Sequence, residues 1–214
     1  MLYPMEGSLT ENLSENFNLG MPSVVIPDFE TNGILDTLQT ISFVMEIPKI
    51  SLEDKKAISD AVYNTEHKLL SVEYAYGESN VYQGTRVSPL SYAFTLAALL
   101  YLEVIIREHP FISKVHNRLK SKLHEFLADN DLSWYGFGSL SYRDIVLWIM
   151  FVKLVTSPPD FRRDNPAMNQ FSEHLEMEEC TQQGLRGRLK RIAWRDRICD
   201  YHLDRIWREM TMNT

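Results

Sequence analysis

The segment from residue 185 to residue 210, LRGRLKRIAWRDRICDYHLDRIWREM, concentrates the residue types that could do chemistry. Its basic side chains could neutralise phosphate groups on a nucleic acid. Its thiol and imidazole could bind a metal ion. Its apolar residues could instead form the inward face of a packed helix whose outer face is charged.

A metal site in this segment would have to use Cys199 and His202, which lie three residues apart and so share one helix face. They supply two ligands, whereas a closed zinc site takes four. The nearest further candidates, His174 and Cys180, belong to a separate stretch of the chain. We therefore expect Cys199 to pack as a small apolar group, His202 to lie on the surface, and the chain to hold no cofactor.

A nucleic-acid surface is disfavoured by the pattern of charge. Eight basic residues between positions 185 and 208 are interleaved with Asp196, Asp200 and Asp204. Phosphate binding relies on uncompensated positive charge, whereas opposite charges four residues apart form ion pairs on a solvated helix. We expect Arg195 and Arg205 to lie on this charged face, and we expect no direct DNA binding by this chain.

The apolar residues of the same segment recur three or four positions apart, which is the period of one helix face. A single amphipathic helix over 185–210 is therefore predicted, with its apolar stripe turned toward the core. The stripe consists of Leu189, Ile192, Ala193, Trp194, Ile198, Tyr201, Leu203, Ile206, Trp207 and Met210.

Catalytic motifs are absent from the sequence: there is no Gly-rich phosphate loop, no Gly-x-Ser-x-Gly elbow and no His-Glu-x-x-His pair. His116, His124 and Glu125 could share a helix face, and Glu103 could pair with Arg107 inside an apolar helix. Such pairs are more often structural than catalytic. The sequence indicates a protein that is not an enzyme.

Composition places the chain among ordinary globular proteins, with 214 residues of which 44% are hydrophobic. The longest apolar run, Tyr92 to Ile106, contains Glu103 and is shorter than the roughly 20 residues that span a bilayer. Neither this run nor the N-terminus predicts a membrane segment or a leader. Two cysteines do not make a disulfide framework and fit a reducing, intracellular compartment.

The net charge of −7 originates in the N-terminal region, because residues 1–48 contain no Lys or Arg. Five glycines and prolines interrupt this region before residue 28, so residues 1–32 are expected to form an irregular acidic arm. The favoured interpretation is an extended arm that lies on the domain. The alternative is an activation segment whose acids and apolar residues bind a groove on a partner protein.

The remainder, residues 33–214, is predicted to be a single irregular all-α domain of about seven helices. No strand pattern occurs, and Gly77 to Gly84 is expected to be a loop. The expected helices cover about 33–47, 51–74, 88–110, a segment from Phe111 to about Phe126, 141–158, 169–179 and 185–210.

The order of three segments resembles the fungal-specific transcription factor domain, the regulatory region of fungal zinc-cluster transcription factors. They are ALLYLEVIIREHPFISKVHNRLKSKL, DIVLWIMFVKLV and LKRIAWRDRICDYHLDRIWREM, and the resemblance covers about residues 90 to 210. It rests on Tyr101, Leu102, Arg107, Pro110, Leu147, Trp148, Trp194, Asp196, Cys199 and Trp207.

Two features depart from this family's pattern. Lys153 stands where the family often has small glycines, which puts close helix packing there in doubt, and the six-cysteine zinc cluster with its coiled-coil linker is missing. DNA binding is therefore not carried over to this chain.

The resemblance implies an all-helical regulatory or effector domain that controls transcription in the nucleus by contacting the transcription machinery, a DNA-binding partner or a small-molecule effector. The alternative is a stand-alone helical domain, cytoplasmic and without a transcriptional role, that binds a small molecule or a protein. Candidate residues for an effector or partner surface are Arg107, Trp148, Trp194, Tyr201 and Trp207.

Overall fold

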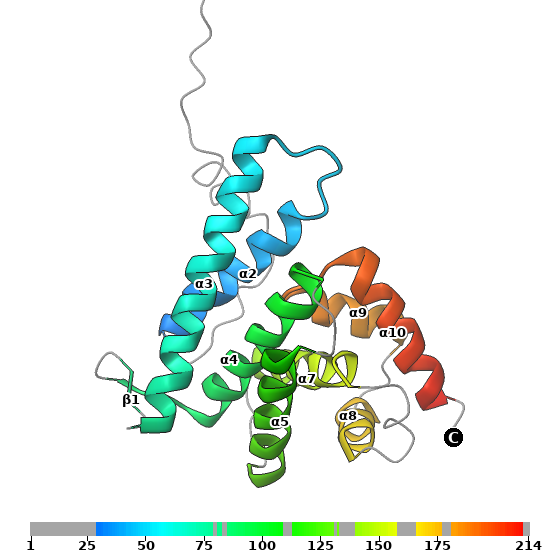
Figure 1. The fold of residues 1–214 in the computed structure, drawn as a ribbon. Helices are drawn as coiled ribbons and strands as arrows, with labels where there is room; N and C mark the ends of the chain where they lie inside the picture. Colours follow the sequence, from blue (N-terminus) through cyan, green and yellow to red (C-terminus); the bar gives the residue numbers. More distant parts are fainter. Residues whose placement is uncertain are drawn as a thin grey trace, which may run out of the picture.

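The computed structural model describes residues 29–78, 81–82, 85–108, 113–130, 132, 140–157, 166–176 and 181–211 (Figure 1). Within these ranges the fold is all-α, as the sequence predicts, and it contains eight α-helices and one short π-helix. The α-helices are α2 (Phe29–Val44), α3 (Leu52–Glu78), α4 (Pro89–Tyr101), α5 (Lys114–Asp129), α7 (Leu140–Val155), α8 (Pro166–Glu176), α9 (Gln182–Lys190) and α10 (Asp196–Thr211).

Helix α4 is the centre of the fold, and every residue from Leu90 to Tyr101 is buried. It packs against α2, α3, α5 and α7, with α2 and α3 on one side in Figure 1. The hydroxyl of Ser88 accepts a 3.1 Å hydrogen bond from the main-chain N–H of Ser91, and Pro89 occupies the first turn, which confirms the predicted helix start. An apolar helix contacted on all sides needs no polar face.

The segment Pro89–Ile106 is the one part of the described chain with the length and apolar composition of a membrane span, and 83% of it is buried inside the protein. The sequence predicts a regular helix as far as Pro110, but the α-helix ends at Tyr101. Instead α4 passes into a π-helix, η1 (Leu102–Ile106), in which the N–H of Arg107 donates to the carbonyl of Leu102 at 2.9 Å. Glu108 follows with a φ of 54°, so the helix ends there.

Helix α3 begins where its cap predicts, because the hydroxyl of Ser51 accepts a 3.0 Å hydrogen bond from the N–H of Asp54. It continues to Glu78, four residues beyond the expected end. The expected loop, Gly77 to Gly84, contains the two-residue strand β1 (Val81–Tyr82), which pairs antiparallel with β2 (Thr85–Arg86) just after the loop, so that part of the prediction was wrong. The buried face of α3 carries Val62, Thr65, Leu69 and Val72.

Helix α2 begins at Phe29, four residues before the expected helix start at about residue 33. The preceding residues of the arm lie outside the described ranges, so its predicted irregular structure stays a prediction. Helix α8 begins three residues earlier than expected and ends at Glu176.

The predicted helix over 185–210 is in fact two helices, α9 and α10, separated by a bend at residues 191–195. Ile192, Ala193 and Trp194 are at most 4% exposed. Three consecutive residues of a straight helix span about 200° around its axis and cannot all face one core surface. The bend buries all three, which is why the continuous stripe is interrupted there.

Helix α7 is buried from Ile145 to Val155, and this includes Lys153, which is 6% exposed. Burial lowers the pKa of the Lys153 amine. The position that raised doubt about close packing is therefore buried in the core.

Candidate functional site

The three segments on which the family resemblance rests meet at the bend between α9 and α10. The indole N–H of Trp148, on α7, donates a 2.8 Å hydrogen bond to the carbonyl of Ala193 in the bend. The ring of Trp148 also contacts the ring of Tyr101, on α4, with centroids 5.4 Å apart. We call this meeting point, formed by Tyr101, Trp148 and residues 191–195, the junction.

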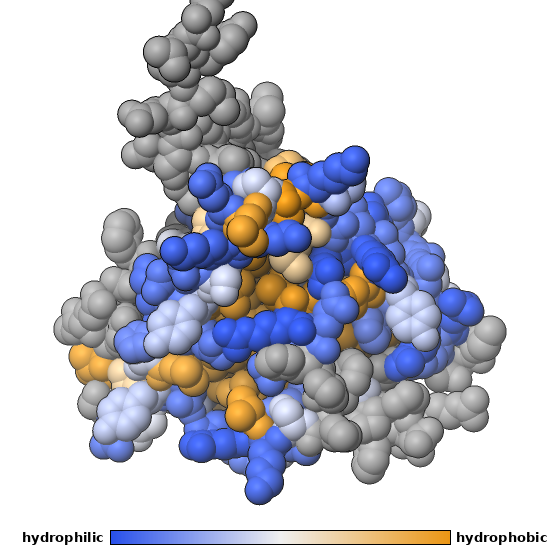
Figure 2. Space-filling view, turned by 45° about the horizontal axis from the view of Figure 1, so that its top comes forward, coloured by the Kyte–Doolittle hydropathy of each residue, from blue (hydrophilic) through white to orange (hydrophobic). Residues whose placement is uncertain are grey.

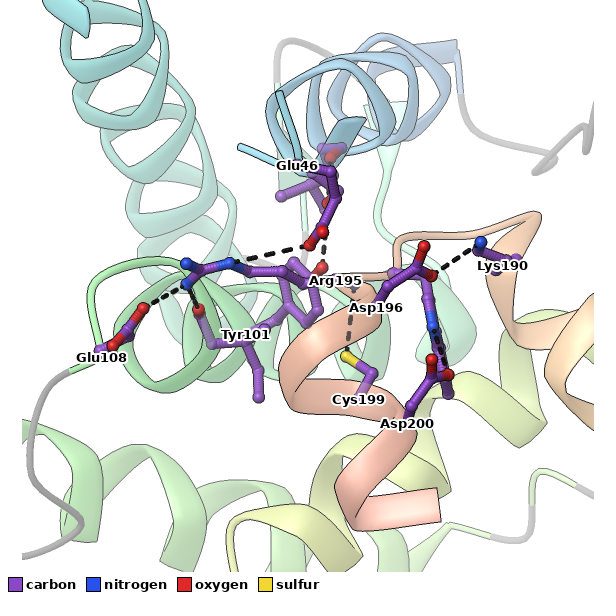
Figure 3. A network of polar contacts seen from close by, with 12 residues as sticks. Glu46, Tyr101, Glu108, Lys190, Arg195, Asp196, Cys199 and Asp200 are labelled. Carbon is purple, nitrogen blue, oxygen red and sulfur yellow. Dashed lines mark hydrogen bonds and ion pairs between the residues drawn. The ribbon is translucent and has the colours of Figure 1, made fainter. Parts of the chain in front are cut away.

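Arg195 anchors the bend to two other parts of the chain (Figure 3). Its Nη1 donates to the carbonyl of Ile105 at 2.8 Å and lies 2.7 Å from Oε1 of Glu108. Its Nε lies 4.0 Å from Oε1 of Glu46, just after α2. The Arg195 side chain is only 12% exposed, so the expectation that it lies on a solvated face was wrong. Its partners are distant in sequence, and helical spacing carries no information about them.

Two weakly acidic groups lie on the inner side of the junction. The thiol of Cys199 accepts a 3.4 Å hydrogen bond from the N–H of Arg195, and burial raises its pKa to about 12. The hydroxyl of Tyr101 lies 2.9 Å from that of Ser42, and burial raises its pKa well above the usual value. Both groups therefore stay protonated near neutral pH, which suits packing rather than nucleophilic or base chemistry.

A second set of charges lies on the outer side of the bend (Figure 3). Arg186 binds Asp200 through Nε at 2.6 Å and binds Asp196 through Nη2 at 3.0 Å. Lys190 lies 2.7 Å from Asp196. The indole of Trp194 also donates to Asp200, at 3.2 Å. The hydrogen bond from Arg186 is the main reason that the pKa of Asp200 is lowered.

Asp144 is the most deeply buried carboxylate of this region, with its side chain 2% exposed. It accepts a 2.6 Å hydrogen bond from Nε of Arg188 and also pairs with Arg191. Two cations on one buried carboxylate fix α9 and the bend against α7. No partner for Asp144 was predicted from the sequence. An acid directly before the apolar residues 145–152 was the signal that it needs a buried partner.

The five candidate residues do not form one surface. Trp148 is 0% exposed and Trp194 is 4% exposed, stacked on Phe151 with ring centroids 5.2 Å apart. Trp207 is partly buried against the core. The apolar spacing places Tyr201 on the inward stripe, but its side chain is 61% exposed, so that expectation was wrong.

Arg107, the fifth candidate, forms a bidentate ion pair with Glu66 of α3, at 2.7 and 3.0 Å. The expected partner, Glu103, is 3.9 Å away. Arg107 therefore ties the end of η1 to α3.

Glu103 and His116 are two further buried ionisable groups outside the junction. The hydroxyl of Ser113 accepts from the N–H of His116 at 3.0 Å and lies 3.4 Å from Glu103 Oε1. His116, expected on a helix face with His124, is 1% exposed, and burial together with Lys120 lowers its pKa. Ser113 is the N-cap of α5, which accounts for its hydrogen bond without a catalytic role.

An open hollow of about 500 Å³ lies between the start of α9 and the middle of α10, and its wall includes Arg186 and Asp200, which already bind each other. No group of three His, Cys, Asp or Glu side chains is placed to hold a metal ion in the described ranges.

No family model, curated protein or solved structure matches the chain. The resemblance to the fungal-specific transcription factor domain therefore stays an expectation that rests on the residues themselves.

Proposed function

We propose that this chain is a regulatory or effector domain of a fungal transcription regulator of the zinc-cluster type. It acts in the nucleus by contacting the transcription machinery, a DNA-binding partner or an effector, and DNA recognition is supplied outside this chain.

The observation that carries the proposal is the junction. The three segments of the resemblance contact one another there: Tyr101 meets Trp148, forty-seven positions away, and Trp148 binds Ala193 in the bend that precedes Cys199. Arg195 links the same bend to the end of the π-helix. If loosely spaced core residues together close one fold, this shared role explains why they occur in a given order along the chain. The contacts therefore support treating that order as a family signature.

The arrangement of charge supports a role away from DNA. Arg186, Arg188, Arg191 and Arg195 all bind carboxylates of this chain. Phosphate binding at these side chains would have to displace those carboxylates, and the counterion release that drives DNA binding would be reduced accordingly.

The alternative of a small-molecule site walled by tryptophans gains no support at the junction. Trp148 and Trp194 are covered by protein on nearly all sides, and each donates its indole N–H to a group of this chain. These contacts are those of core aromatics.

The test is a tethering assay in yeast. The chain is fused to a heterologous DNA-binding domain, and the output of a reporter with matching sites is measured. The proposal expects the fusion to raise or lower the output several-fold relative to the DNA-binding domain alone. Equal output from the two proteins, at equal nuclear abundance, would contradict the proposal.

A further inference from the structure

Helix α3 exposes large side chains along its outer face. Leu52 is 83% exposed, Tyr63 65%, Leu70 47% and Tyr74 68%. The steps between them are eleven, seven and four residues, each close to a whole number of helical turns, so the four side chains form one stripe. The opposite face of α3 is buried against α2 and α4. Within the described ranges no other element covers the stripe.

The surface view agrees with this placement. Figure 1 shows α3 along one edge of the molecule, and Figure 2 shows apolar side chains reaching the surface between hydrophilic ones on that side. We call Leu52, Tyr63, Leu70 and Tyr74 the α3 stripe.

We propose that the α3 stripe binds the α3 stripe of a second copy of this chain, with the two helices antiparallel and a two-fold axis at Tyr63. The spacing of the stripe matches itself in this arrangement. Leu52 and Tyr74 lie eleven residues before and after Tyr63, so Leu52 of each copy faces Tyr74 of the other while the two Tyr63 rings meet at the axis. A two-fold contact requires this kind of self-complementary surface.

The polar residues within the stripe are compatible with the same register. Lys56 of one copy faces Leu70 of the other, and the aliphatic stem of the lysine can cover the leucine while the amine stays in water. Ser59 faces His67, two groups that can share a hydrogen bond.

Asp60 and Glu66 lie three residues before and after Tyr63, so this register brings their like charges near each other. Glu66 already binds Arg107 through two hydrogen bonds, so its charge is compensated within its own copy.

The buried area sets the expected strength. Aromatic side chains bury about 150–250 Å² each, so the exposed parts of the two tyrosines and two leucines supply roughly 500 Å² per copy and about 1,000 Å² in total, near the lower limit for a specific interface. The dimer should therefore be reversible and concentration-dependent. A symmetric stripe of this size fits a second copy better than an unrelated partner, which would not need a centre at Tyr63.

This inference is independent of the proposed function. Helix α3 precedes residues 90–210, which carry the family resemblance, and the junction contains none of the stripe residues.

Sedimentation velocity on the full chain tests the proposal. Between about 1 and about 200 µM, the range in which weak interfaces assemble, the mass should rise from 25.0 kDa toward twice that value. Tyr63→Arg places two arginines against each other at the axis and should weaken the dimer at least tenfold. The matched control is Tyr201→Arg, a similarly exposed tyrosine on α10, which should dimerise like the wild type. Circular dichroism checks that both variants are folded.

Cysteine cross-linking tests the register, with Cys180→Ser as the background and Cys199 protected by burial. Tyr63→Cys should cross-link to itself. Leu52→Cys should cross-link to Tyr74→Cys in a mixture of the two variants and should not cross-link to itself. A monomer at about 200 µM, a dimer unchanged by Tyr63→Arg, or self-cross-linking at position 52 would each overturn the proposal.

Discussion

The guanidinium of Arg195 donates a 2.8 Å hydrogen bond to the main-chain carbonyl of Ile105, which lies ninety residues earlier in the chain. Ile105 is in the π-helix that ends the central helix, where carbonyls lack partners within the helix. One side chain therefore satisfies the end of one buried helix and fixes the bend between two others.

Replacing Arg195 tests the importance of this contact. Arg195→Ala should lower the free energy of unfolding by about 2–3 kcal/mol, because it removes a charged hydrogen bond and leaves the carbonyl of Ile105 without its donor. Arg208→Ala is the matched control: Arg208 is exposed and, among the described residues, its side chain bonds to the carbonyl of Asp204 alone, so its loss should cost under about 0.5 kcal/mol. Urea unfolding measures both. Equal midpoints for the two variants would contradict the role of Arg195.

Two substitutions of Trp148 distinguish the contribution of its ring packing to stability from that of its hydrogen bond. Trp148→Phe keeps an aromatic ring but leaves the carbonyl of Ala193 without a donor, which should cost about 1–3 kcal/mol. Trp148→Ala should cost about 3–5 kcal/mol, or prevent folding, because it also opens a cavity. Trp207→Ala, at a partly buried position, should cost clearly less than Trp148→Ala. The ranking comes from chemical denaturation, and a Trp207 variant as unstable as Trp148→Ala would show that the core has been placed wrongly.

The lowered pKa of His116 predicts how the stability of the folded protein depends on pH. Burial and Lys120 hold the pKa of His116 below its ordinary 6.5, whereas a hydrogen bond with the Thr156 main chain and Glu103 act in the opposite direction. The unfolded chain then binds a proton more readily, so stability is full above about pH 7 and falls as pH drops from 6.5 through the folded-state pKa.

His116→Gln should flatten the stability curve in this range, and His124→Gln, at an exposed position on α5, should leave it as in the wild type. Thermal unfolding between about pH 5 and pH 8 gives the curves. A wild-type protein that gains stability toward pH 5.5 through His116 would reverse the predicted sign.

Cys199 should be chemically inert in the folded protein. It is 0% exposed and its pKa is raised to about 12, so the thiolate that reacts with disulfide reagents is scarce at pH 8. In a Cys180→Ser background, a thiol reagent should therefore detect no cysteine until urea is added. The same burial predicts no stoichiometric zinc by elemental analysis, and about one zinc ion lost on Cys199→Ser would contradict it.

DNA binding is the fifth prediction. No specific duplex binding is expected from the purified chain, because the basic side chains of α9 and the bend bind Asp144, Asp196, Asp200 and Glu108. Fluorescence anisotropy at several salt concentrations measures it. A sequence-selective affinity that falls steeply with salt would show that these ion pairs open for phosphate.

Local sequence signals were sufficient for much of the helical framework. Helices were predicted to begin at residues 51 and 88, and Ser51 and Ser88 cap α3 and α4 there. The apolar spacing of α2 and α3 matches their buried faces. These features depend on residues within one or two turns, which is the range that periodicity describes.

The junction could not be predicted from such local signals, because its contacts join residues that are far apart in the sequence. Spacing along 185–210 suits one helix, and the bend is held by Trp148, by Arg195 and by Gln39, which donates to the carbonyl of Arg191. For the same reason Arg195 was predicted to be exposed, although its partners are Ile105 in η1, Glu108 after η1 and Glu46 after α2.

The central claim is that the folded domain regulates transcription when another module brings it to DNA. The most direct measurement is the reporter output of the tethered chain beside that of the tethered Arg195→Ala and Arg208→Ala variants, at equal nuclear abundance. We predict a several-fold change in output for the wild type and Arg208→Ala, and a reduced change for Arg195→Ala because the junction is weakened. Output equal to that of the DNA-binding domain alone for all three proteins would contradict the claim.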